Sequence, residues 1–328
     1  MLQHRLLLLA AAASAVPSSA WLALSPVDPA SGKVTAFALD DKGARGADTL
    51  SFPLMAGEAV LPNSFACGRC FCLVLGTNEQ AHTSTLYNFS FCIVPVPALE
   101  SILPLGHVAY NLHSGEGEGD GGNGYSVMID RSKAPPTFEV IQVVGAQVNR
   151  MVDISPFVDA FGGTIFPGGT AFCAETLTMW VAVQTRDPTH DTLVTVDLVK
   201  KQVVGNVSIV KPALAAHFAD CSTNRVGGFT LVPGAGGAPA TVQMGMLSAA
   251  GAFTVLDQAA LPAGSSLQLA GIADFLHDPR WNPSEYGALL YSGWGEKLPG
   301  AIFVSSGKMG SAQLNPLNTE AASIAVAY

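Results

Sequence analysis

The sequence predicts an all-β fold in which six copies of a unit of short strands are arranged radially. A β-rich run, a tight turn and a second β-rich run recur along the chain, and the residues that enter these turns are Asp40, Ser90, Asp130, Asp197, Ser248 and Ser306. The mean step between them, (306 − 40)/5, is about 53 residues. A period near 50 that is built from short strands is typical of radial β architectures.

The composition agrees with this fold class. The 34 glycines and 21 prolines are spread along the chain, which fits many turns and argues against long helices. Hydrophobic residues make up 49% of the chain and charged residues 12%, so it is too apolar to be disordered. Strands buried on both faces would account for this apolar content without a polar alternation.

The strands are predicted in chain order, three or four to a copy. Copies one to three contain Trp21–Leu24, Val34–Leu39, Thr49–Leu54; Phe71–Leu75, Thr85–Phe91, Glu100–Leu105; and Val108–Leu112, Tyr125–Asp130, Phe138–Val144. Copies four to six contain Thr170–Ala174, Leu177–Gln184, Thr192–Leu198, Val203–Ile209; Phe229–Val232, Thr241–Leu247, Phe253–Asp257; and Gly287–Tyr291, Ala301–Val304, Ala312–Leu314.

The last strand is predicted to close the ring. Ser323–Tyr328 is an isolated β-type run with no partner nearby in sequence, and the first copy has only three strands where a radial unit needs four. Pairing of the C-terminal run with the first copy would supply the fourth strand and hide both sheet edges. The alternative architecture is a pair of β-sandwiches, in which strands recur at similar spacing.

The fourth copy resembles the repeats of YVTN- and NHL-like β-propellers. The resemblance rests on Phe172–Val183, Thr192–Asp197 and Lys200–Val204, and the turn Asp28–Lys33 looks like the inter-strand turn of the same superfamily. It covers most of the chain, at the level of strand and turn pattern only. No double glycine recurs as in Kelch repeats, and no Trp-Asp ending is present. The resemblance implies a six-bladed β-propeller as a single domain over residues 21–328.

Residues 1–20 are predicted to be a cleaved secretory signal peptide. Met1–Arg5 is a short basic region, Leu6–Val16 is apolar, and small residues precede Trp21. Eleven apolar residues are too few to cross a bilayer, which needs roughly 20. The alternative is an uncleaved N-terminal anchor. The protein is therefore expected to be secreted, without stable membrane insertion.

The net charge argues against a nucleic acid partner, and two sequons mark candidate glycosylation sites. The net charge of −9 disfavours phosphate backbones, so we expect no nucleic acid partner. Asn88 and Asn206 each begin an Asn-x-Ser sequon and are the glycosylation candidates, with Asn206 on a predicted outer strand and Asn88 in the middle of a strand.

The six cysteines predict disulfides in an exported protein. Cys72 or Cys70 could pair with Cys92 across one hairpin, and Cys173 could pair with Cys221 because both follow a phenylalanine in successive copies. The Cys-x-x-Cys-x-Cys run from Cys67 to Cys72 also admits a zinc interpretation, with His82 or Cys92 as a further ligand.

Polar residues near the starts of copies are candidates for an axial site that binds a ligand or a metal. They are Asn63, His107, Asn149, His217, Asp220, Asp274 and His277. Six-bladed relatives such as gluconolactonase and paraoxonase-like lactonases hold a divalent cation with such groups, but their residues find no one-to-one match here. Turn and cap roles are the alternative. The acidic glycine-rich run Gly115–Gly124 is expected to be a solvated loop.

Two functional hypotheses follow. The first is a secreted binding module that takes an extracellular protein, peptide or glycan on its axial face, because no nucleophile elbow, His-Glu-x-x-His motif or phosphate-binding loop occurs. The alternative is a cation-dependent hydrolase or lactonase with a metal on the axis. A structural matrix component is a third possibility. No cofactor is predicted, although calcium could be held by such oxygen ligands.

Overall fold

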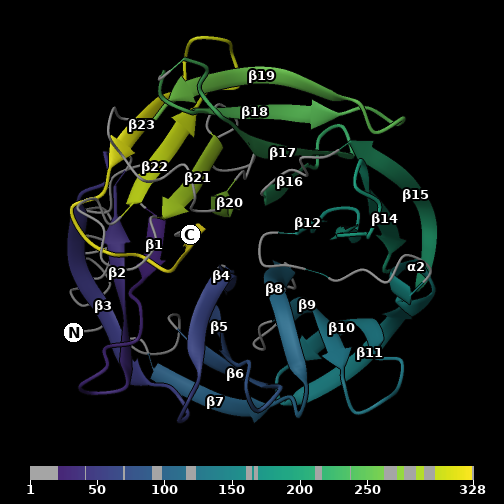
Figure 1. The fold of residues 1–328 in the computed structure, drawn as a ribbon. Helices are drawn as coiled ribbons and strands as arrows, with labels where there is room; N and C mark the ends of the chain where they lie inside the picture. The colour runs from purple at the N-terminus through teal and green to yellow at the C-terminus, as the bar shows by residue number, and fades with distance from the viewer. Residues whose placement is uncertain are drawn as a thin grey trace, which may run out of the picture.

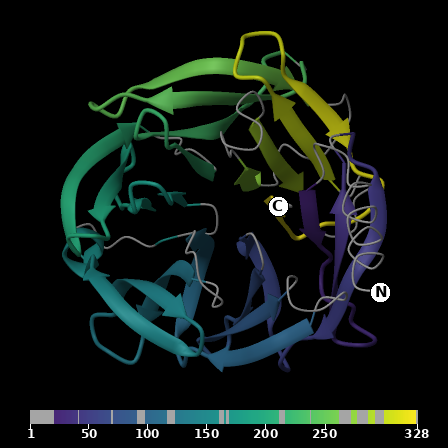
Figure 2. The same ribbon diagram turned by 180° about the vertical axis from the view of Figure 1, so that it is seen from behind.

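The computed structural model describes residues 21–40, 42–68, 71–90, 98–115, 123–159, 165, 169–210, 216–236, 238–261, 272–276, 286–291 and 300–326. These residues form six four-stranded antiparallel sheets placed around a common axis (Figures 1 and 2). The arrangement is a β-propeller, which confirms the predicted all-β radial fold. The alternative of two stacked sandwiches is wrong.

We number the sheets in chain order and give the strands of each from the axis outward. Sheet 1 contains β24 (Ser323–Val326), β1 (Trp21–Leu24), β2 (Lys33–Leu39) and β3 (Arg45–Pro53). Sheet 2 contains β4 (Ala59–Cys67), β5 (Phe71–Asn78), β6 (Thr83–Ser90) and β7 (Ala98–Pro104). Sheet 3 contains β8 (Val108–Gly115), β9 (Asn123–Asp130), β10 (Thr137–Val144) and β11 (Gln147–Asp153).

The second half of the chain repeats the pattern. Sheet 4 contains β12 (Thr170–Cys173), β13 (Thr178–Val183), β14 (His190–Asp197) and β15 (Gln202–Val210), and a short helix, α2 (Ser155–Asp159), precedes it. Sheet 5 contains β16 (Ala216–Asp220), β17 (Arg225–Val232), β18 (Thr241–Leu247) and β19 (Phe253–Ala260). Sheet 6 contains β20 (Ile272–Leu276), β21 (Tyr286–Tyr291), β22 (Gly300–Ser305) and β23 (Gln313–Pro316).

The ring closes as the sequence predicts. β24 pairs antiparallel with β1, with Trp21 opposite Val326 and Leu24 opposite Ser323. Ile324 and Ala325 are almost fully buried, so the closing strand is part of the core as well as of the hydrogen-bonded ladder. A strand from each end of the chain therefore completes sheet 1.

The core lies between neighbouring sheets, which explains the apolar runs without alternation. All six residues of β13 are buried. Val181 and Val194 pack with Tyr125 and Val140 of sheet 3, whereas Trp180 packs with residues of sheet 5 on the opposite face. Because each middle strand is covered on both faces, an apolar side chain is favoured at every position.

We call the connections between the third and outermost strands of each sheet the outer turns; that of sheet 2, residues 91–97, lies outside the described residues. Five of the six predicted turn-entry residues enter or flank an outer turn; Asp130 instead follows β9 and enters the turn between the second and third strands of sheet 3. The outer turn of sheet 3 is at Gly145, between β10 and β11, where the backbone φ is +57°. The assignment of Asp130 to the repeated position is therefore wrong.

Outer turns also contact the outermost strand of the preceding sheet. A Cβ atom on Gly251, in sheet 5, would lie 2.0 Å from the carbonyl oxygen of Ser208 in β15. A Cβ on Gly43, in sheet 1, would lie 2.6 Å from the carbonyl oxygen of Pro316 in β23. Both glycines have positive φ, so the turn geometry and the close approach each favour glycine.

Sheet 6 makes the same kind of contact through a carboxylate. Asp257 of β19 is fully buried and accepts hydrogen bonds from the Ser305 hydroxyl (2.5 Å), the Ser311 hydroxyl (2.7 Å) and the Gly310 amide (2.8 Å). Burial alone would raise the pKa of Asp257, but these bonds to the ionised form outweigh it and the pKa is lowered.

Candidate functional site

The innermost strands are joined to one another by side chains around the axis. The Ser64 amide of β4 donates to the Ser323 hydroxyl of β24 (3.3 Å), and the Ser114 hydroxyl of β8 donates to the Cys67 carbonyl of β4 (2.7 Å). Thr170 of β12 bonds to His113 of β8 across 2.6 Å. With the Cys173–Cys221 disulfide, these contacts link the innermost strands of five sheets.

His113 is the titratable member of this chain of contacts. Burial lowers its pKa to about 4, so the imidazole is neutral at pH 7 and one ring nitrogen can accept while the other donates. Its ring centroid lies 5.7 Å from that of Phe172, which stacks on Tyr125 at 4.9 Å. A neutral imidazole in an aromatic setting can orient a polar ligand but carries no charge for it.

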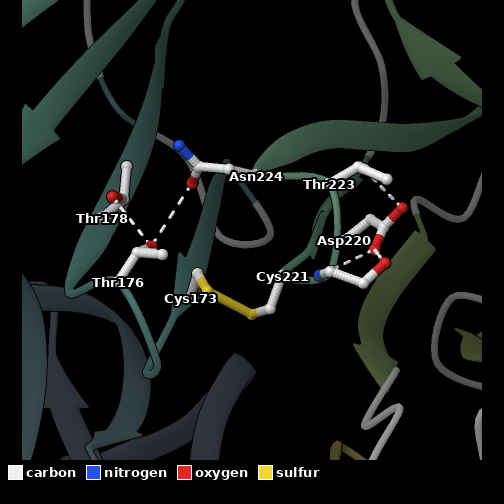
Figure 3. The surroundings of a disulfide bond; sticks show 8 residues. Cys173, Thr176, Thr178, Asp220, Cys221, Thr223 and Asn224 are labelled. Carbon is white, nitrogen blue, oxygen red and sulfur yellow. Dashed lines mark hydrogen bonds between the residues drawn. A yellow bond between two sulfur atoms is a disulfide. The ribbon is translucent and has the colours of Figure 1, made fainter.

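In sheets 4 and 5 the turns that join the innermost strand to the second strand are fully described, and we call them the inner turns. Cys173 ends β12 and Cys221 follows β16, and the disulfide between them bridges sheets 4 and 5 with Cα atoms 5.3 Å apart (Figure 3). This pairing confirms the prediction.

A second contact joins the same two inner turns. The Thr176 hydroxyl donates to the Asn224 side-chain oxygen (3.3 Å) and to the Thr178 hydroxyl (3.0 Å), as Figure 3 shows. Side chains on both turns are exposed, among them those of Glu175 and Thr223. The two turns thus form a braced polar rim, which we call the disulfide rim: residues 174–177 and 221–224.

Asp220 caps one of these turns. Its carboxylate accepts bonds from the Ser222 amide and hydroxyl and from the Thr223 hydroxyl (2.7 Å), as in an Asx turn. The structure therefore supports the turn-capping alternative for this residue. Sequence alone gave no means to choose between the two roles.

Most of the other predicted axial residues lie on or next to innermost strands. Asn63 lies in an irregular part of β4 with φ +57°, His217 is buried in β16, and Asp274 is in the backbone of β20. Asn149 is exposed on the outermost strand β11, so its predicted axial position is wrong. His277 lies outside the described residues.

His107 has a local partner away from the inner turns. It directly precedes β8, and its Nδ1 lies 3.4 Å from the Asp130 carboxylate, which also lies 3.5 Å from the Lys133 ammonium. A hydrogen bond from the Ser132 hydroxyl is the main cause that holds the pKa of Asp130 below its usual value, burial opposes it, and His107 and Lys133 add smaller contributions. His107 thus belongs to a turn at the end of β9.

Of the remaining cysteine predictions, one is wrong and the others fall on residues that the structure does not describe. Cys72 is bonded to Cys67 on the paired strand, with Cα atoms 4.0 Å apart, so pairing of Cys72 with Cys92 is wrong. The zinc interpretation loses two of its proposed thiolates to this bond. Cys70 and Cys92 themselves lie outside the described residues.

The two sequons differ sharply in exposure. Asn88 is 5% exposed within β6, whose residues 84–90 are all buried, so a glycan at Asn88 is incompatible with this packing. Asn206 and Ser208 are exposed on β15, the outermost strand of sheet 4.

Among the described residues, no three His, Cys, Asp or Glu side chains lie close enough together to hold a metal ion. This does not cover Asp274 and His277, because the side chains of β20 and residues 277–285 are outside the described part of the chain. Within the described chain, no helix has the length and apolar character needed to cross a membrane.

The polar residues that link the innermost strands were not among the predicted site residues. Ser64, His113, Ser114, Thr170 and Ser323 stand alone or beside one other polar residue, and no motif spacing marks them. The one local signal is asparagine in an irregular strand. Asn111 of β8, like Asn63 of β4, has positive φ (+60°), a conformation in which asparagine is enriched.

Structural comparison supports the propeller fold. The β-propeller domain of Cps50 (Swd1) from Myceliophteria thermophila is 7% identical, with a TM-score of 0.51 over 93% of this chain and 90% of that chain. The β-propeller domain of the trilobed protease from Pyrococcus furiosus is 11% identical, with a TM-score of 0.47 over 88% of this chain and 75% of that chain. A hypothetical selenium-binding protein from Sulfolobus tokodaii is 10% identical, with a TM-score of 0.45 over 94% and 95% of the two chains.

These likenesses concern the fold alone. No protein-family model matches the chain, and no curated protein matches it. The propeller architecture rests on the arrangement of the described sheets, and no comparison places the chain among YVTN or NHL proteins.

Proposed function

We propose that the protein is an exported binding module whose disulfide rim contacts a protein, peptide or glycan ligand. The observation that carries the proposal is the bracing of two neighbouring inner turns by the Cys173–Cys221 disulfide and the Thr176–Asn224 hydrogen bond. Loops held by a rigid scaffold lose little conformational entropy on binding, so their exposed polar groups are well suited to recognition.

Export is supported by two features. The N-terminal sequence has the basic, apolar and small-residue order of a secretory signal. The two disulfides agree with it, because such bonds persist mainly in oxidising compartments.

The test is binding of the purified protein to glycan and peptide arrays, followed by affinity measurement on each hit. Glu175→Arg changes an exposed side chain of the rim and should weaken binding at least tenfold, whereas Gln147→Arg, on the exposed outermost strand β11, should leave affinity unchanged. Equal affinity for both variants and the wild type would place the ligand elsewhere. Stoichiometric bound calcium together with turnover of a lactone would favour the hydrolase alternative.

A further inference from the structure

The outermost strand of sheet 4 has an unusual composition for an edge. β15, Gln202–Val210, is nine residues long, pairs only with β14 among described strands, and contains no charged residue. The outermost strands β3, β7 and β11 each carry an exposed Asp, Glu or Arg, whereas the one charged residue of β19, Asp257, is buried. Charged side chains on edges normally discourage pairing with another chain.

The exposed side chains of β15 include two valines beside the polar Gln202, Asn206 and Ser208. Val204 is 48% exposed and Val210 is 66% exposed. Val207 and Ile209 point to the opposite face, where they pack with residues of sheet 5. Long uncharged segments of high β-propensity with exposed apolar side chains are aggregation hazards.

The sequon lies between these exposed valines. Asn206, Ser208 and Val210 share one face because side chains alternate along a strand, and all three are exposed. Gly205, next to Asn206, has open space where a Cβ would be, so nothing crowds the backbone on its N-terminal side. The Asn206 amide is therefore accessible, in contrast to the buried amide of Asn88.

We propose that Asn206 carries an N-linked glycan that blocks strand addition at the edge of β15. The inference rests on the export proposed above. The donor is an oligosaccharide linked to a polyprenyl pyrophosphate. In the transfer, a bond forms between Asn206 Nδ2 and the anomeric carbon of the sugar, and the bond from that carbon to the pyrophosphate oxygen breaks. The amide nitrogen loses one proton. The bulky hydrated glycan takes over the protective role that exposed charges have on the edges of β3, β7 and β11.

The first experiment tests the site. The full chain is secreted from a eukaryotic host twice, once with its own N-terminal segment and once with a standard secretory leader, and occupancy is read by peptide mass spectrometry after enzymatic deglycosylation. Glycan is expected at Asn206 and not at Asn88. An unmodified Asn206 in the secreted, folded protein overturns the assignment. If only the standard leader yields glycosylated protein, the proposed export fails while the site assignment stands.

The second experiment tests the role. Ser208→Ala abolishes the sequon without touching Asn206, and Ser208→Thr preserves it. Light scattering at increasing concentration should show association of the Ser208→Ala protein and none of the Ser208→Thr protein. A further Val204→Lys substitution in the Ser208→Ala background should suppress the association by restoring an edge charge. Equal scattering of both Ser208 variants would refute the shielding role and leave only a modification site.

Discussion

At the residue scale, glycines in the outer turns hold neighbouring sheets at close range. Gly251→Ala should lower the free energy of unfolding by about 2–4 kcal/mol, because it adds a left-handed backbone cost of about 1–2 kcal/mol to a clash with the Ser208 carbonyl. Chemical denaturation measures this loss.

Gly145→Ala is the matched control. It lies in another outer turn, has positive φ and has open space around the added methyl group, so only the backbone cost of about 1–2 kcal/mol is expected. Equal losses in the two variants would show that the contact between sheets 4 and 5 contributes nothing.

His113 should make stability depend on pH. Its folded pKa of about 4 lies below its ordinary value of 6.5, so the unfolded chain binds the proton more readily. The contribution of the neutral imidazole is therefore fully present above pH 6.5 and is lost as the pH falls toward 4. Urea denaturation at pH 7 and pH 5 should show a smaller difference for His113→Gln than for the wild type.

His82→Asn provides the comparison for this titration. His82 is exposed, and asparagine tolerates its positive φ of +56°. This variant should keep the pH dependence of the wild type. If it loses as much as His113→Gln, the dependence does not arise at the contact between β8 and β12.

At the element scale, the two disulfides should contribute unequally. They close loops with sequence separations of 48 and 5 residues. The loop-entropy relation gives about 4 kcal/mol for the longer loop and about 2 kcal/mol for the shorter one. Replacing Cys173 and Cys221 by serine should therefore lower the free energy of unfolding more than replacing Cys67 and Cys72. The reverse order, measured in guanidinium, would contradict the loop-entropy account.

The middle strands of the sheets could be predicted from the sequence, whereas several innermost strands could not. Middle strands such as β13 and β14 were predicted because apolar and β-branched residues fill all of β13 and the run Thr192–Val196 of β14. Innermost strands β4, β16 and β20 were missed, since they contain a proline, a histidine and aspartates, and part of their ladders is irregular.

The uneven repeat steps also have a physical explanation. Asp130 and Asp197 both cap turns with their side chains, but the turns follow different strands of their sheets. Placing the repeat of sheet 3 at Gly145 changes the steps around it from 40 and 67 to 145 − 90 = 55 and 197 − 145 = 52 residues. A capping residue marks a tight turn but cannot say which hairpin it closes.

At the scale of the whole molecule, the closing strand should determine whether the ring is stable. Deleting residues 323–328 exposes the edge of β1 and the buried Leu24. We therefore expect the shortened protein to aggregate and to lose its cooperative thermal unfolding transition. Scanning calorimetry with light scattering measures both. An unchanged transition in the shortened protein would contradict the closure.

A point variant keeps the closure testable if the shortened chain does not fold. Ile324 is 1% exposed, and Ile324→Ala should cost about 2–5 kcal/mol as a buried large-to-small change. Val210→Ala, at a side chain that is 66% exposed, should change stability by less than about 0.5 kcal/mol.

The antiparallel pairing of β24 with β1 has a practical consequence for engineering. Trp21 lies directly opposite Val326, so a linker of a few residues would join the two strands into an ordinary hairpin. The chain could then be opened at the exposed Gly236, where a Cβ atom would meet nothing within 4 Å. Such a circular permutant should retain the native sheets while its ring seam becomes covalent.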